Sequence, residues 1–231
     1  MKKIFKNPIL ILAVGVFVIG ASSIGATRAA IVTQSEIDRV NFTTATFEIG
    51  LTGDVDGDLI YFPNLPEEGP VQIGKCYKST VNVANISDEA TGYKEYVRVI
   101  VRKSWTNADG IKDQNLDPDL IELSIADGWV RYEDDTLSKE CEIYYLKDAV
   151  ECGEVKEFLT GITINDTVAT KVVQEGSETE IINKYVYDGQ KVSISIQADA
   201  VQTHHAEDAI HGAWGVEATA TAESDGSITL K

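Results

Sequence analysis

Apolar and polar residues alternate with a period of two along most of this chain. In "ATFEIGL" (45–51) and "KVSISIQADA" (191–200), every second side chain is apolar, as in strands with one face on a core and one in water. "EYVRVIVRKSW" (95–105) differs, because apolar residues also fall among the arginines of its second face. That pattern predicts a central strand.

Shorter segments with strand-forming patterns follow one another, separated by turns rich in Gly, Asn and Asp. They lie at 79–84, 120–125, 128–132, 142–147, 157–164 and 184–187. Helical patterns occur only at 117–121, where Asp117 can cap the first turn and Pro118 suits the first helical position, and at 203–214. We therefore predict an all-β fold, an antiparallel β-sandwich of jelly-roll type with one or two short helices.

The N-terminus has the anatomy of a secretory signal peptide: lysines, then an apolar run, then small residues. Small side chains at Thr27 and Ala29 predict cleavage between Ala29 and Ala30. Residues 1–29 would be the signal peptide and 30–231 a single jelly-roll domain, secreted to the extracellular space or the cell surface. The protein would contact the membrane only through the signal peptide, before cleavage. An uncleaved anchor is the alternative, but glycines and serines shorten the apolar run.

The net charge of the chain excludes some classes of binding partner. The formal net charge is −17, and the first 29 residues hold four basic and no acidic side chains, so the mature chain is still more negative. Such a surface repels nucleic acid and anionic lipid.

The chain has three cysteines, Cys76, Cys141 and Cys152, and an exported protein meets oxidising conditions. Because three is an odd number, they cannot all pair within one chain. Cys141 and Cys152 close the shortest loop and are the predicted disulfide, although spacing alone does not fix the pairing.

All three histidines, His204, His205 and His211, lie in "THHAEDAIH" and are candidate zinc ligands. No two of them have the i,i+4 spacing of helical zinc pairs. We interpret them as surface histidines, and a site completed by residues elsewhere stays open.

Asp54, Asp56 and Asp58 are weak calcium candidates, because they alternate as in the first half of an EF-hand loop. The loop pattern then fails, with Leu59 in place of Gly and Leu65 in place of Glu. There is no G-x-S-x-G motif or other marked nucleophile. We predict no catalytic residue and no cofactor, with zinc or calcium as the open alternatives.

Several segments in order resemble the camelysin/TasA-like family of exported bacterial proteins, which a SipW-type signal peptidase processes. They are "GATRA" (25–29), "NFTTATFEI" (41–49), "YVRVIVRKSW" (96–105), "LDPDLIEL" (116–123), "YYLKDAVECGE" (144–154), "ADAVQ" (198–202) and "AWG" (213–215). The resemblance implies a jelly roll and either of two activities: fibre formation in the extracellular matrix, or metallo-endopeptidase activity. The segment between "ADAVQ" and "AWG" is a variable polar loop in that family, so no catalytic role is carried over to the histidines.

Residues 30–40, "AIVTQSEIDRV", mix β-branched and polar residues just before the first strand. Such a segment can add as a donor strand to the open edge of a neighbour. The sequence thus predicts an exported structural protein that self-associates into oligomers or fibres. The alternatives are a camelysin-like secreted zinc metallo-endopeptidase and a carbohydrate-binding or adhesive module.

The histidine spacing generates a prediction that separates the first two of these functions. After dialysis, the mature protein is expected to retain less than one equivalent of zinc, measured by atomic absorption, and to cleave no casein. Stoichiometric zinc that is lost together with proteolysis when His204, His205 and His211 are replaced by Ala would establish the metallo-endopeptidase instead.

Overall fold

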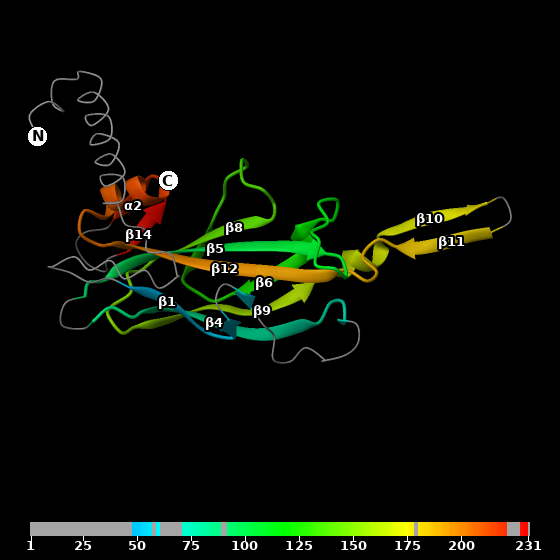
Figure 1. The fold of residues 1–231 in the computed structure, drawn as a ribbon. Helices are drawn as coiled ribbons and strands as arrows, with labels where there is room; N and C mark the ends of the chain where they lie inside the picture. Colours follow the sequence, from blue (N-terminus) through cyan, green and yellow to red (C-terminus); the bar gives the residue numbers. More distant parts are fainter. Residues whose placement is uncertain are drawn as a thin grey trace, which may run out of the picture.

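The structure is a computed structural model that describes residues 48–56, 59–60, 71–88, 92–177, 180–220 and 227–230. Two antiparallel sheets face each other (Figure 1). One has the order β1-β4-β9-β6, formed by Ile49–Gly53, Cys76–Asn85, Val155–Ile164 and Ile121–Ile125. The other has the order β2-β3-β12-β5-β8-β7, formed by Val55–Asp56, Leu59–Ile60, Lys191–Gln202, Glu95–Thr106, Cys141–Leu146 and Trp129–Tyr132.

The main core lies between the two sheets and consists of the side chains of each strand that point inward. Val81 and Val83 of β4 and Phe158 of β9 meet Val97 and Val99 of β5, and all five are fully buried. Alternation in the sequence produces this layer, because every second side chain of a strand points to the same face.

A second core lies on the outer face of the six-stranded sheet, beneath helix α2 (Ala206–Trp214). Ala206, Ile210 and Trp214 are spaced four residues apart, so they share one face of the helix and are buried against that sheet. Tyr96 of β5 belongs to this second core. The prediction that 95–105 is a central strand is confirmed, since β5 lies between β12 and β8.

The predicted all-β antiparallel sandwich with short helices is confirmed. The chain changes sheet between β4 and β5, between β5 and β6, and between β8 and β9, as chains do in sandwiches of the jelly-roll type. The predicted cap is also present, since the Asp117 side chain accepts a hydrogen bond from Asp119 N–H at a 3₁₀ turn, Pro118–Leu120. No helix within the described ranges combines the length and apolar character needed to span a membrane.

Three boundaries differ from the sequence prediction. Residues 184–187 do not form one strand, because β10 (Val172–Ser177) and β11 (Glu180–Tyr185) make a separate two-stranded hairpin. The helix expected over 203–214 begins only at Ala206, since His205 has φ 51° and breaks the helical path. The C-terminal Ile228–Leu230 forms β14, paired with β13 (Ala218–Ala220).

Phe158 provides a test of the main core. Its ring meets Trp129 and Tyr144 edge-to-face at centroid distances of 4.8 and 5.5 Å, and the residue is fully buried. Phe158→Ala is expected to lower the free energy of unfolding by about 3–5 kcal/mol, because it removes these contacts and leaves a cavity. Val155→Ala, at a 54% exposed position of the same strand, is expected to cost less than about 1 kcal/mol. Urea denaturation of the two variants would show equal losses if Phe158 were not a core residue.

Candidate functional site

Two strand edges lie together at one side of the sandwich. β12 pairs with β5 along all twelve of its residues, from Lys191↔Thr106 to Gln202↔Glu95. On its other edge the described residues supply one pair, with Leu59 of β3. β1 pairs with β4 alone in the described part and lies next to β12 (Figure 1). Backbone N–H and C=O groups along edges of this kind can bind a further strand.

The described chain begins beside these edges, at Glu48. The Glu48 N–H donates to Ser87 Oγ at 2.7 Å, and the Glu48 C=O accepts from Ile86 N–H at 2.9 Å. The start of β1 is thereby attached to the end of β4. The predicted signal peptide (1–29), the cleavage site between Ala29 and Ala30, and the segment 30–40 lie outside the described residues.

The attachment of Glu48 continues into a buried carboxyl group. Ser87 Oγ, which accepts from Glu48, donates to Glu95 Oε1 at 2.9 Å. Glu95 is the first residue of β5 and has no exposed surface, and its Oε2 has no hydrogen-bond partner among the described residues. Burial raises the pKa of Glu95 to about 8, against the opposing effect of the Ser87 hydrogen bond. At neutral pH this carboxyl is therefore mainly protonated and uncharged.

Asn85 organises the polar groups around Glu95. Its Nδ2 donates to the carbonyls of Tyr93 and Val150 at 2.9 and 3.1 Å, and its Oδ1 accepts from Ser87 N–H at 3.1 Å. One fully buried side chain thus joins the end of β4, the turn before β5 and the segment after β8. The end of the sandwich where the described chain begins is a connected hydrogen-bond network.

The three histidines occupy the turn before α2 and its exposed side. The rings of His204 and His205 meet edge-on at 4.3 Å, and both residues precede the first residue of the helix. His211 lies on the last turn, with Nδ1 3.2 Å from Glu217 Oε1. The structure does not gather the three side chains around one point.

Of the three aspartates that are calcium candidates, the structure describes the side chain of Asp54. Asp54 Oδ2 accepts from Thr80 N–H at 2.7 Å and so supports the turn after β1. Asp58 and the side chain of Asp56 lie outside the described part. Within the ranges that the structure describes, no group of three or more His, Cys, Asp or Glu side chains could hold a metal ion.

The predicted disulfide between Cys141 and Cys152 is not formed in this structure. Cys141 pairs with Arg102 at the start of β8. Cys152 lies beyond the other end of that strand, past the bridge between Val150 and Glu95. Seven residues of extended β5 separate the two positions, about 23 Å, whereas a disulfide needs Cα atoms within about 7 Å. The two cysteines are therefore close along the chain but too far apart in the fold to form a disulfide.

Sequence reasoning missed the buried polar groups, although a signal was present. Glu95 falls in the same strand phase as Val97 and Val99, the phase that faces the core. Lys103 falls in this phase too, and it pairs with Glu142 and donates to the Ile121 carbonyl at 2.8 Å. Charged residues in the apolar phase of a central strand are therefore the positions at which sequence alone points to buried polar contacts.

Comparisons with protein-family models, with curated proteins and with solved structures found no match to this chain.

Glu95 generates a prediction for the pH dependence of stability. Its pKa of about 8 in the folded state exceeds the ordinary value of 4.5, so its contribution is fully present below about pH 4.5 and is lost as pH rises toward 8. Glu95→Gln preserves the shape of the neutral carboxyl. The variant should match the parent at pH 4.5 and be more stable by about 4 kcal/mol at pH 8.5.

Urea denaturation at a series of pH values measures this difference. Glu133→Gln is the control, since the Glu133 side chain is 82% exposed, and its pH profile should follow that of the parent. A Glu95→Gln variant whose stability stays parallel to the parent from pH 4.5 to 8.5 would mean that Glu95 titrates normally.

Proposed function

We propose that this protein is an exported structural protein of the cell surface or extracellular matrix that assembles into filaments by donor-strand exchange. In this mechanism, residues 30–40 of one copy add as a strand to the open edge of β12 in the next. The observation that supports this proposal is the edge of β12 that faces away from β5. β12 has twelve residues, all paired with β5, but on this other edge the described residues supply one pair, Ser195↔Leu59.

The dimensions and pattern of segment 30–40 suit this edge. Eleven extended residues span about 36 Å, close to the about 40 Å of the twelve residues of β12. Ile31, Thr33 and Ile37 share one strand phase. Ile194, Ile196 and the alanines of β12 face the inter-sheet core in the same way. A donor strand in this phase would extend the apolar layer past β12.

The position of Glu48 favours exchange between copies over a free tail. Residues 41–47 connect segment 30–40 to β1, and Glu48 is fixed by its bonds to Ser87 and Ile86. A filament results when the added strand belongs to the next copy, because a head-to-tail contact leaves an open edge at one end and an unused donor segment at the other. Such an assembly needs no catalytic group.

The strong negative charge sets the conditions for assembly. The whole chain carries a formal charge of −17, and like charges on neighbouring copies repel at low ionic strength. Salt reduces the Debye length to about 8 Å at 0.15 M, and acid neutralises carboxylates. Both changes should favour the filament.

We predict that protein beginning at Ala30 forms filaments or higher oligomers on lowering the pH or raising the ionic strength, whereas protein beginning at Asn41 stays monomeric. Light scattering and negative-stain electron microscopy on the two chains measure this. The shorter chain is the matched control, because it retains every described strand and lacks only the donor segment. Monomers of both chains under all conditions would exclude donor-strand exchange, and equal filaments from both would exclude segment 30–40 as the donor.

A further inference from the structure

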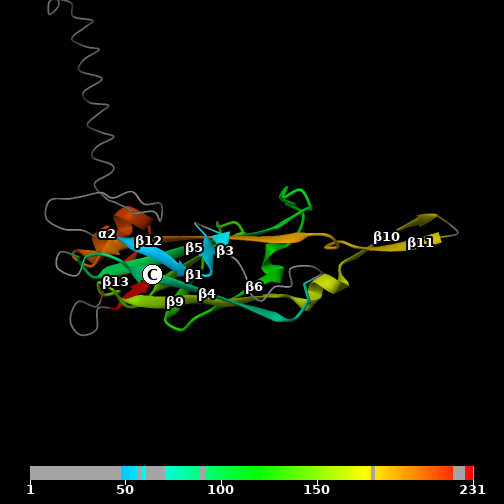
Figure 2. The same cartoon turned by 60° about the horizontal axis from the view of Figure 1, so that its bottom comes forward.

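The hairpin formed by β10 and β11 extends away from the two-sheet body at the end opposite α2 (Figures 1 and 2). It is a sheet of its own, with six paired positions from Val172↔Tyr185 to Ser177↔Glu180. A two-stranded hairpin without a covering surface is only marginally stable in water. Its place in the fold therefore calls for an explanation.

The hairpin has apolar side chains on both of its faces. Val172 and Tyr185 are direct cross-strand partners on one face, and they are 40% and 59% exposed. Val173 lies on the opposite face. Ile182 shares that face, because its partner Glu175 is two residues beyond Val173; both are about half exposed. A ribbon that serves only as a loop would not need apolar pairs on both sides.

The base of the hairpin is held by the body of the protein. Tyr187, two residues after β11, packs edge-on against Trp105 at 4.8 Å, and its hydroxyl accepts from Asp117 N–H at 3.0 Å. Val186 N–H donates to the Lys171 carbonyl at 2.9 Å. These contacts set the direction in which the ribbon leaves the sandwich.

The most exposed large hydrophobic side chains among the described residues lie at the two ends of the molecule. At the end with the hairpin they are Val71, Ile73, Ile111, Val172, Val173, Ile182 and Tyr185. At the opposite end they are Ile86, Tyr93 and Val155. Ile86 directly follows β4, Tyr93 precedes β5 and Val155 begins β9, so the three surround the point where Glu48 is attached.

We propose that the β10–β11 hairpin binds a second copy of this chain, at the end formed by Ile86, Tyr93 and Val155. The inference rests on the proposed function, because head-to-tail exchange determines which ends meet. The donor segment leaves from Glu48, at the Ile86 end. If it enters the neighbour from the hairpin end, the neighbour's ribbon overlaps the Ile86 end by about 20 Å, the length of six extended residues. Each junction then has two contacts, the donor strand and the hairpin.

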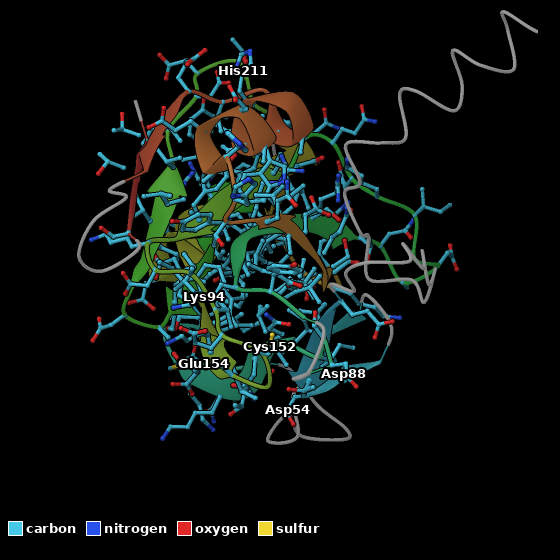
Figure 3. The ribbon with its side chains drawn as sticks, turned by 90° about the vertical axis from the view of Figure 1, so that its left-hand side faces the viewer. Asp54, Asp88, Lys94, Cys152, Glu154 and His211 are labelled. Carbon is cyan, nitrogen blue, oxygen red and sulfur yellow. The ribbon has the colours of Figure 1, made fainter. Side chains whose placement is uncertain are left out.

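Both ends carry charges of both signs. Lys171 is exposed at the base of the hairpin, and the ribbon itself holds Lys184 together with Glu175 and Glu180. The opposite end carries Lys94, Glu154 and Asp88, with Lys94 and Glu154 close together (Figure 3). Apolar side chains at the centre with mixed charges around them are typical of protein–protein interfaces.

A hairpin variant and an end variant test the proposal on the chain that begins at Ala30. The hairpin variant combines Val173→Thr, Ile182→Thr and Tyr185→Thr, which keep strand-forming residues and lie outside both cores. The end variant combines Ile86→Thr and Val155→Thr. Each is expected to raise the critical concentration for filament formation about tenfold or more, because apolar burial at every junction is reduced. Ile111→Thr is the matched control, since Ile111 is 64% exposed at the hairpin end but outside the hairpin, and it should assemble as the parent does.

Mixing the two variants is the decisive measurement. At a concentration above the parent's critical value and below theirs, each variant alone should remain monomeric in analytical ultracentrifugation. A 1:1 mixture should form dimers, because the intact hairpin of one variant meets the intact end of the other. Unchanged melting temperatures confirm that the substitutions leave the fold intact.

The outcomes separate this proposal from the proposed function. Parent filaments together with variant filaments at the same critical concentration would overturn the hairpin contact and leave donor-strand exchange standing. An effect of Ile111→Thr equal to that of the hairpin variant would also overturn it. Absence of parent filaments would exclude donor-strand exchange and the hairpin contact with it. Hairpin-dependent sedimentation of monomers with phosphatidylcholine vesicles would assign the ribbon to a lipid surface instead.

Discussion

The pairing of β5 with β12 is the interaction on which the rest of the structure depends. The two strands pair through twelve consecutive residues, and their inward faces are buried along almost the whole pairing, while the outer face is buried mainly near the α2 end. One face, with Val97, Val99 and Ile196, completes the layer between the sheets. The other, with Tyr96 and Val201, supports α2. A shift of the register by one residue would turn both sets of side chains to the wrong layer.

Buried charges reinforce that register. Arg98 and Asp199 are direct cross-strand partners, with Nε 3.1 Å from Oδ2 and the guanidinium 5.2 Å from the Trp214 ring. Asp199 is fully buried, so any register that separates it from Arg98 leaves an uncompensated charge in the interior. Apolar burial supplies most of the stability, while the ion pair penalises alternative pairings. The central sheet is therefore specified more strongly than its edges.

The edges and ends of the molecule differ from the central sheet in what they expose. The most exposed apolar side chains of the described residues lie at the two ends, and the outer edge of β12 is paired with Leu59 alone in the described part. The buried network of Asn85, Ser87 and Glu95 fixes the position at which the chain enters the sandwich. An elongated body with a rigid entry point at one end and a projecting ribbon at the other suits contacts between copies along its long axis.

The sequence by itself determined the sandwich, because alternation with a period of two fixes which face of each strand is apolar. It also determined the central position of 95–105 and the cap at Asp117, both of which depend on local residues. Only the tertiary structure decided the remainder. Cys141 and Cys152 are close along the chain, but Cys141 begins β8 and Cys152 lies beyond its other end. The buried Asn85 beside Glu95 joins three separate segments, the end of β4, the turn before β5 and the segment after β8. The independence of the β10–β11 hairpin depends on where the sandwich ends, which no local pattern encodes. Strand identity is a property of neighbours in sequence, whereas site geometry is a property of register and layer packing between distant segments.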